Sequence, residues 1–180
     1  MGIDVMAKGR SNVVLIGMPG SGKSTVGVIL AKLTARDFVD SDVLIQTSQG
    51  RSLQQIVDQD GHMRLRQIEE DVLLGLDCQD HVIATGGSAP YSHAAMTHLD
   101  SQGIVVFLDV DLATLRRRVH DYATRGLAKR PDQSFTDLFH ERFVLYTKYA
   151  DVTVHCAGLT HEEVCARIID ELNRREPTRD

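Results

Sequence analysis

A chain of 180 residues with 20 basic and 25 acidic side chains has a net charge of −5, which argues against nucleic acid or an anionic membrane as its main partner. Its three cysteines lack C-x-x-C spacing and no apolar run is long enough to span a membrane, which argues against a disulfide framework and a membrane protein. We expect a cytoplasmic monomer that binds neither nucleic acid nor membrane.

The length suits one domain with a single hydrophobic core. The sequence contains no internal repeats and no low-complexity tracts. We expect residues 1–11 to be a flexible lead-in, residues 12–175 to form the domain, and residues 176–180 to be a tail.

The first predicted element is an apolar strand over residues 13–16, which leads directly into a glycine-rich loop. Residues 17–24, GMPGSGKS, fit the pattern G-x-x-x-x-G-K-S/T between a strand and a helical pattern. Glycines allow successive backbone N–H groups to converge on phosphate oxygens, Lys23 reaches the β- and γ-phosphates, and the Ser24 hydroxyl can bind Mg²⁺. The sequence therefore predicts a loop that binds Mg-ATP or Mg-GTP. Its expected nucleotide contacts are Gly17, Gly20, Ser21, Gly22, Lys23, Ser24 and Thr25.

Short β-rich runs alternate along the chain with segments of helical periodicity. The predicted strands cover residues 13–16, 38–39, 81–84, 104–108 and 152–155. The helical patterns cover residues 26–33, 65–76, 112–119 and 164–172. Helix-capping residues stand at Asp111, at Ser134, and at Thr160 with Glu163. This alternation is typical of an α/β fold, a parallel sheet covered by helices.

Residues 120–133 interrupt this alternation with a connection that is too long for a tight turn. It carries the basic residues Arg125, Lys129 and Arg130. Basic side chains on a long loop suit a lid that closes over a polyphosphate, although a plain surface loop is the alternative.

Four further segments accompany the glycine-rich loop in a definite order. Residues 40–42, DSD, follow the second strand, residues 61–69 open a helix, residues 84–88 end the third strand, and residues 142–151 precede the last strand. Together with the loop they resemble shikimate kinase over about residues 12–173. The resemblance implies a three-layer P-loop kinase fold with a five-stranded parallel sheet in the order 2-3-1-4-5 and a lid. It also implies phosphorylation of shikimate to shikimate 3-phosphate by ATP, in aromatic amino-acid biosynthesis.

The resemblance also implies roles for individual residues. Asp42 corresponds to the general base that contacts the substrate hydroxyl groups, and Asp40 to the acid that holds Mg²⁺ through water. In the lid, Arg125 corresponds to the arginine that reaches phosphate and substrate, and Arg118 to the one that stacks on adenine. The remaining substrate contacts are Arg66 and Arg142, which clamp a carboxylate, and the backbone of Gly86 and Gly87.

The chemistry supports these roles, but each has a simpler alternative. Phosphoryl transfer mainly needs an aligned acceptor and neutralised charge, which Asp42, Lys23 and a lid arginine would supply. Ser41 or Asp42 could instead only cap a helix. Arg66 and Glu69, three residues apart, could form an exposed ion pair or hold the arginine in place. Arg142 could be an ordinary surface residue of a helix.

Four positions depart from the family pattern and leave the acceptor open. Ser88 replaces the third glycine of a triplet, His62 replaces a glutamate, and Leu65 replaces a phenylalanine. A second Arg-Pro pair, at residues 130–131, leaves open whether Arg125 or Arg130 is the lid arginine. A kinase for another small polyol or hydroxy acid, such as gluconate, is therefore the alternative.

A nucleotide-dependent switch without catalysis is a hypothesis from another class. Residues 58–61 spell the D-x-x-G pattern of such switches, but they follow a helical pattern rather than a buried strand, and the chain has no N-K-x-D motif to recognise guanine. A catalytically inactive nucleotide-binding protein is a further alternative, although Lys23, Ser24, Asp40 and Asp42 are all present.

Overall fold

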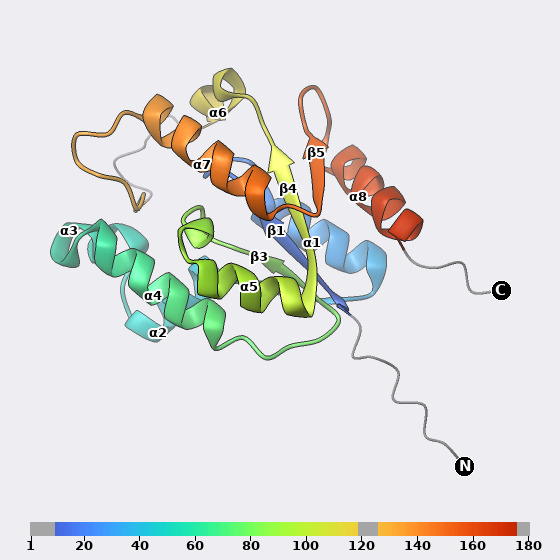
Figure 1. The fold of residues 1–180 in the computed structure, drawn as a ribbon, viewed down its shortest axis with the longest axis horizontal. Helices are drawn as coiled ribbons and strands as arrows, with labels where there is room; N and C mark the ends of the chain where they lie inside the picture. The colour runs from blue at the N-terminus through green and yellow to red at the C-terminus, as the bar shows by residue number, and fades with distance from the viewer. Residues whose placement is uncertain (1–9, 119–125, 176–180) are drawn as a thin grey trace, which may run out of the picture.

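The computed structural model describes residues 10–118 and 126–175 (Figure 1). Their five parallel strands form one sheet in the order β2-β3-β1-β4-β5, which confirms the order that the resemblance implies. Strand β1 lies at the centre and is buried along its whole length, where Val14 pairs with Ile83 and Val105. The strands are β1 (Asn12–Ile16), β2 (Asp37–Asp40), β3 (His81–Ala84), β4 (Gly103–Asp109) and β5 (Val152–His155).

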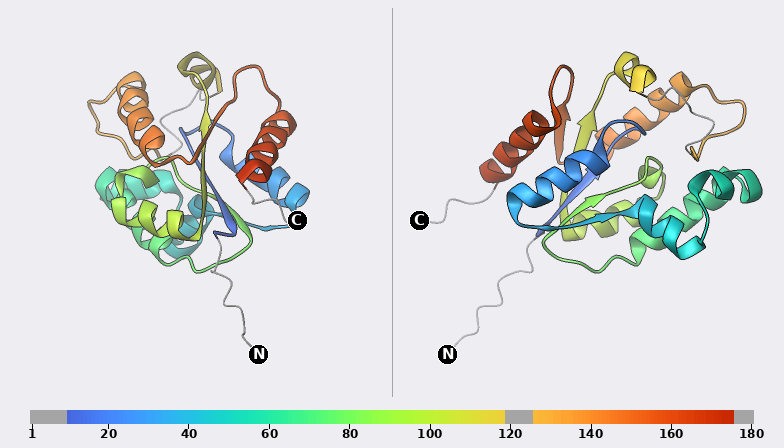
Figure 2. Two further views of the ribbon diagram at one scale, coloured as in Figure 1. Left: turned by 45° about the vertical axis from the view of Figure 1, so that its right-hand side comes forward. Right: turned by 180° about the vertical axis from the view of Figure 1, so that it is seen from behind.

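Helices cover both faces of the sheet. Helices α1 and α8 pack together on one face, and α5 and α7 lie on the other (Figure 2, left). The helices are α1 (Lys23–Thr34), α2 (Ser41–Gln49), α3 (Leu53–Asp60), α4 (His62–Leu74), α5 (His93–Gln102), α6 (Leu112–Arg118), α7 (Phe135–Tyr149) and α8 (His161–Arg175), with a 3-10 turn, η1 (Ala89–Tyr91). The three-layer α/β fold expected from the sequence is therefore confirmed.

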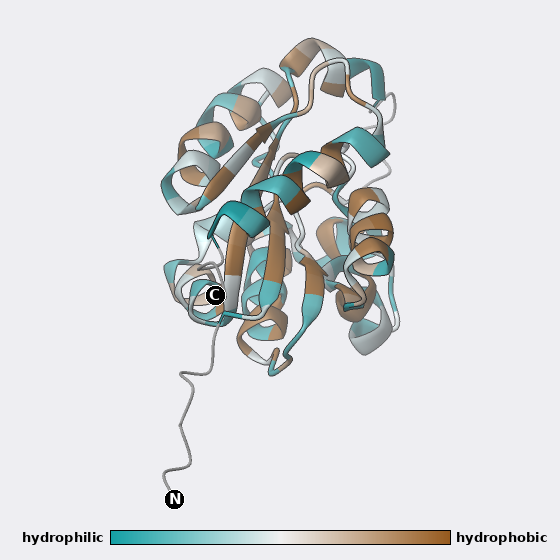
Figure 3. Ribbon diagram, turned by 90° about the vertical axis from the view of Figure 1, so that its right-hand side faces the viewer, coloured by the Kyte–Doolittle hydropathy of each residue, from teal (hydrophilic) through white to brown (hydrophobic). Residues whose placement is uncertain are grey.

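Two apolar clusters hold these layers together. The larger one surrounds the sheet, whose central strands are largely hydrophobic in Figure 3. The smaller one lies among α2, α3 and α4 and includes one residue of the segment that follows position 125. Its buried members are Ile45, Ile56, Leu65, Ile68 and Ala128. The second cluster fixes the outer wall of the cleft described below.

Helix capping follows the expectation at three helix starts. The Asp111 carboxylate accepts a hydrogen bond from the Thr114 backbone N–H at 2.8 Å. Ser134 forms a capping box with Asp137. Thr160 and Glu163 exchange side-chain to backbone hydrogen bonds of 2.8 and 3.2 Å. These caps satisfy backbone groups that the first turn of a helix leaves unpaired.

Of the expected lead-in, the structure describes only residues 10 and 11, and residues 1–9 and 176–180 lie outside the described residues. Arg10 forms ion pairs with Asp100 and Asp151, and the Ser11 hydroxyl accepts a hydrogen bond from the Asp80 backbone at 2.9 Å. These two residues are therefore bonded to the domain. The division into lead-in, domain and tail stays a prediction. Within the described ranges, no helix has the length and apolar character needed to cross a membrane.

Candidate active site

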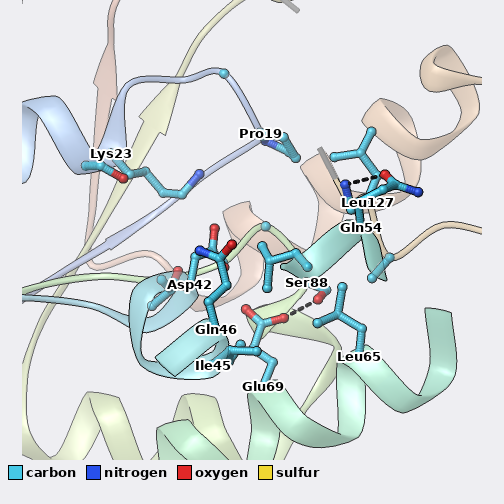
Figure 4. A pocket seen from close by; sticks show the side chains of 18 of the residues that line it. Pro19, Lys23, Asp42, Ile45, Gln46, Gln54, Leu65, Glu69, Ser88 and Leu127 are labelled. Carbon is cyan, nitrogen blue, oxygen red and sulfur yellow. Dashed lines mark hydrogen bonds between the residues drawn. The ribbon is translucent and has the colours of Figure 1, made fainter. Parts of the chain in front are cut away.

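A cleft of about 580 Å³ opens where β1, β2 and β3 end. Its walls come from the glycine-rich loop, the start of α2, helix α4, the turn after β3, the segment 126–128 and helix α7. Figure 4 shows Lys23 and Asp42 on one side of it, with Glu69 and Ser88 further along. In parallel α/β sheets, ligands bind at this carboxyl edge of the strands.

The glycine-rich loop forms the end of the cleft next to α1. Gly17 has φ +149°, and a side chain there would begin 2.9 Å from the Leu108 carbonyl oxygen, so glycine is required. The Lys23 ammonium lies inside the loop and donates to the carbonyl oxygens of Gly17 and Met18 at 2.8 and 3.0 Å. Burial lowers the pKa of Lys23 to about 8, although the Asp42 charge opposes the shift. Five of the seven expected nucleotide contacts line the cleft, namely Gly20, Gly22, Lys23, Ser24 and Thr25.

Two side chains whose oxygen atoms could bind a metal ion, Ser24 and Asp40, lie next to each other beside this loop. The Ser24 hydroxyl donates to Asp40 Oδ2 at 2.5 Å. Asp40 Oδ1 caps α2 by accepting from the Asp42 backbone at 2.9 Å, so the capping residue is Asp40 and not Ser41 or Asp42. The Ser41 hydroxyl instead accepts from the Gly86 backbone at 2.9 Å. Oxygen donors of this kind suit Mg²⁺, which takes few protein ligands and completes its shell with phosphate and water.

Two carboxyl groups meet at the turn after β3. A Cβ atom on Gly86 would lie 2.4 Å from Glu69 Oε1 and 2.7 Å from Asp42 Oδ1, so both oxygens lie against this glycine. Burial raises the pKa of Asp42, although the Lys23 charge opposes the shift. Burial and the Asp42 charge raise the pKa of Glu69 to about 7. A carboxyl group with a raised pKa is suited to accept a proton near neutral pH.

The close approach at Gly86 predicts a large effect of one methyl group. We expect Gly86→Ala to push Asp42 and Glu69 from their positions and to lower kcat/KM about 100-fold, since a displacement of about 1 Å can have that cost. Gly75→Ala is the matched control, because a Cβ atom there meets its nearest neighbour at an ordinary 3.4 Å. Steady-state kinetics on both variants measure the effect, and equal losses would refute the role given to Gly86.

Glu69 does not hold Arg66 in the way the sequence suggested. Its Oε2 accepts a hydrogen bond from the Ser88 hydroxyl, and its Oε1 has no partner. Arg66, three residues earlier, instead stacks on the Tyr91 ring, 3.5 Å from guanidinium carbon to ring centroid. Helical spacing predicted a contact between Arg66 and Glu69, but Arg66 contacts the Tyr91 ring and Glu69 bonds to Ser88.

Arg66 and Arg142 converge on one oxygen atom. Their Nη2 atoms donate to the Ala128 carbonyl at 3.2 and 2.9 Å. Arg142 is only 1% exposed, which rules out the alternative of an ordinary surface residue. The Nε atom of each arginine is buried without a hydrogen-bond partner. Two guanidinium groups that meet at one oxygen, with donors to spare, provide the geometry for a carboxylate.

Tyr91 in η1 supports both arginines, and the sequence analysis did not identify it. Its ring lies 3.5 Å from Arg66 and 5.4 Å from Arg142, measured to the guanidinium carbons. Its hydroxyl donates to Glu141, whose other oxygen accepts from Gln133 at 2.8 Å. No motif or spacing marks this tyrosine, because its role depends on contacts with α4 and α7.

We expect Tyr91→Leu to raise the KM for a carboxylate acceptor about 30-fold, since a desolvated cation–π contact contributes about 2 kcal/mol. Tyr91→Phe keeps the ring and loses the hydrogen bonds of the hydroxyl group to Glu141 and Arg142, so its KM should rise much less than that of the Leu variant. The KM for ATP provides the internal reference. A Phe variant as impaired as the Leu variant would show that the hydroxyl, and not the ring, is what matters.

The described part of the expected lid, residues 126–133, lies against α3 and α4. The Gly126 backbone donates to Gln54 Oε1 at 2.8 Å, and Leu127 lines the cleft. Arg130 instead pairs with Glu141 at 3.3 Å and, like Lys129, does not line the cleft. Arg130 is therefore not placed as the lid arginine, whereas Arg125 lies outside the described residues.

The other expected residues fall on the cleft wall. Arg118 lines it and donates to the Gly20 carbonyl at 3.4 Å, beside the glycine-rich loop. Gly87 lies so close to Arg142 and Pro19 that a Cβ atom would approach their side chains to 2.7 and 2.9 Å. Of the departures from the family pattern, Leu65 and Ser88 line the cleft, and His62 lies in a neighbouring hollow with Lys129.

A phosphate-binding loop at one end of a cleft, carboxyl groups beside it and an arginine pair beyond them define a P-loop phosphotransferase that acts on a hydroxyl group. The comparisons with known proteins agree. Residues 19–173 match the family described as shikimate kinase, and the chain belongs to that family.

Individual relatives cover nearly the whole chain. Shikimate kinase of Thermodesulfovibrio yellowstonii is 35% identical over 91% of this chain and 95% of its own length. That of Gloeobacter violaceus is 40% identical over 86% and 88%. Among solved structures, shikimate kinase from Acinetobacter baumannii in complex with shikimate has a TM-score of 0.85 at 30% identity, over 92% of this chain and 94% of that one.

Proposed function

We propose that this chain transfers the γ-phosphoryl group of ATP to a hydroxyl group of shikimate, which gives shikimate 3-phosphate for aromatic amino-acid biosynthesis. The observation that carries the proposal is the convergence of Arg66 and Arg142 on the Ala128 carbonyl, in a cleft whose other end is the phosphate-binding loop. A small hydroxy acid fits such a site with its carboxylate at the arginines. The relative from A. baumannii, which is described with shikimate bound, supports this choice of acid.

Asp42 is the proposed general base. It orients the attacking hydroxyl and accepts the proton of that hydroxyl as the new P–O bond forms. Because the transition state is loose, the proton need not be removed before the bond forms. The raised pKa of Asp42 supports this role. The buried Lys23 ammonium leaves the loop carbonyls and stabilises the charge on the transferred phosphoryl group.

Ser24 and Asp40 are the proposed residues for Mg²⁺, the latter through water. The ion, when bound, neutralises charge on the phosphates. The adjacent oxygens of the two side chains support this assignment. No cluster of three or more acidic, histidine or cysteine side chains offers another metal site within the described ranges.

The other binding roles follow the same geometry. The substrate carboxylate takes the place of the Ala128 carbonyl at Arg66 and Arg142, and the backbone of Gly86 and Gly87 lies along the acceptor. Arg118 stacks on the nucleobase, and Arg125 reaches phosphate and substrate. A monomeric state, a cytoplasmic location and the absence of nucleic-acid or membrane partners stay predictions.

Release of ADP in a coupled assay with Mg-ATP tests the proposal. Shikimate is compared with gluconate and a panel of small hydroxy acids, with Lys23→Ala as the blank. Turnover that depends on shikimate is expected. Turnover only with gluconate or another acceptor would make Ser88 and the other departures from the family pattern the basis of a changed specificity. Slow hydrolysis without any acceptor would favour a nucleotide-dependent switch.

A further inference from the structure

The hydroxyl group of Ser88 lies at a point where the family pattern has no side chain. Ser88 is 7% exposed and donates to Glu69 Oε2, as the dashed line in Figure 4 shows. Glu69 itself is 3% exposed. A buried carboxylate needs hydrogen-bond partners, and Ser88 is the one that the described residues supply.

The second oxygen of Glu69 lies at the turn after β3, beside Asp42. Glu69 Oε1 has no partner and lies, like Asp42 Oδ1, against Gly86 on the wall of the cleft. An unpaired buried carboxylate oxygen is costly unless a ligand satisfies it. An acceptor with more than one hydroxyl group could donate to Asp42 and to Glu69 at once.

The hydroxyl of Ser88 also decides which way Glu69 can turn. The charged and titratable groups that act on Glu69 are Asp42, Lys23, Arg142 and Tyr146. The positive charge of Arg142 attracts the carboxylate, whereas Asp42 repels it. Without the bond to Ser88, the Glu69 carboxylate is free to rotate toward Arg142 and away from Asp42. It would then compete with the substrate carboxylate for Arg142.

We propose that Ser88 is a positioning residue, which holds one oxygen of Glu69 so that the other faces the acceptor beside Asp42. This inference rests on the proposed function, because it assigns the free oxygen to a second hydroxyl of the same acceptor. Ser88 lines the cleft and acts on the acceptor through Glu69.

Loss of the Ser88 hydroxyl is expected to change the pH profile of the reaction. The Ser88 hydrogen bond stabilises the ionised form of Glu69 and lowers its pKa, against the burial and the Asp42 charge that raise it to about 7. Loss of the hydroxyl therefore raises the pKa of Glu69 further. If the ionised form binds the acceptor, the acid limb of kcat/KM moves to higher pH.

The test compares Ser88→Ala and Ser88→Thr with the unaltered protein, and uses Ser48→Ala as the matched control. Ser48 also loses a hydroxyl donor, but one that bonds only to the Ile45 carbonyl at 3.0 Å. In Ser88→Ala we expect kcat/KM for shikimate to fall about tenfold, the cost of a hydrogen bond to a charged group. The acid limb of the kcat/KM profile should move to higher pH, and the KM for ATP should not change. Ser88→Thr should restore both kcat/KM and the position of the acid limb. A Ser88→Ala profile that superimposes on the unaltered one would overturn the proposal.

Two further measurements test the role of Ser88 separately from any folding defect of the variant and from the identity of the acceptor. In a Glu69→Gln background, Ser88→Ala should cause no additional loss, and a full additional loss would contradict action through Glu69. An NMR titration of the Glu69 carboxyl carbon in the free protein should show a higher pKa in Ser88→Ala, and an unchanged value would contradict the positioning role. Failure of shikimate as an acceptor in the unaltered protein would overturn the proposed function separately, and the titration would still decide the role of Ser88.

Discussion

Asp42→Asn is expected to lower kcat for shikimate by about 10³-fold, within the range that general-base catalysis contributes. The amide keeps the size of the side chain but cannot accept the proton from the attacking hydroxyl. ATP binding should stay nearly unchanged, because Asp40 caps α2 and the carbonyl oxygens of Gly17 and Met18 hold the Lys23 side chain in the loop.

Rapid-quench kinetics and a titration of ATP separate these two effects. Asp37→Asn is the matched control, since Asp37 is exposed at the start of β2 and should tolerate the change. Retained turnover in Asp42→Asn would rule out Asp42 as the base. A loss of ATP affinity equal to the loss of turnover would place Asp42 in the nucleotide site instead.

Arg142→Met is expected to raise the KM for shikimate by about 10² to 10³-fold. A carboxylate held by Arg142 loses one or two charge-assisted hydrogen bonds, each with a contribution of about 1.5–3 kcal/mol. Stability should respond differently. Arg142 is 1% exposed, and among the described residues it has no carboxylate within ion-pair distance, so an apolar side chain of similar length should lower the melting temperature by no more than a few degrees.

The comparison of KM with melting temperature distinguishes a binding residue from a structural one. Arg64→Met is the matched control on α4, because Arg64 is exposed. An unchanged KM in Arg142→Met would refute the arginine clamp. A melting temperature lowered by many degrees would show that Arg142 mainly supports the fold.

The sheet could be predicted because its signals are local. Each strand is a short apolar run, and the five predicted runs correspond to the five strands within two residues at either end. Their spatial order came from the family resemblance and not from periodicity. Helices α2 and α5 were not predicted, because small or polar residues such as Ser41 and Ala95 are among their few buried side chains and weaken the apolar repeat.

The candidate site could be predicted only where backbone motifs define it. The glycine-rich loop, Asp42 and the turn at Gly86 each follow a strand end, so the parallel sheet brings them together. The partners of Arg66 and Glu69 depend on contacts between distant segments, with Tyr91 and Ser88 respectively. Helical spacing alone therefore suggested the wrong partner for Glu69.

Phosphorus NMR of a reaction mixture that contains the protein, Mg-ATP and shikimate tests the central claim most directly. We predict one new phosphomonoester signal that couples to the proton on C3 of shikimate, and its growth should match the release of ADP. A signal of inorganic phosphate alone, or a phosphomonoester that forms only when gluconate replaces shikimate, would contradict the proposed reaction.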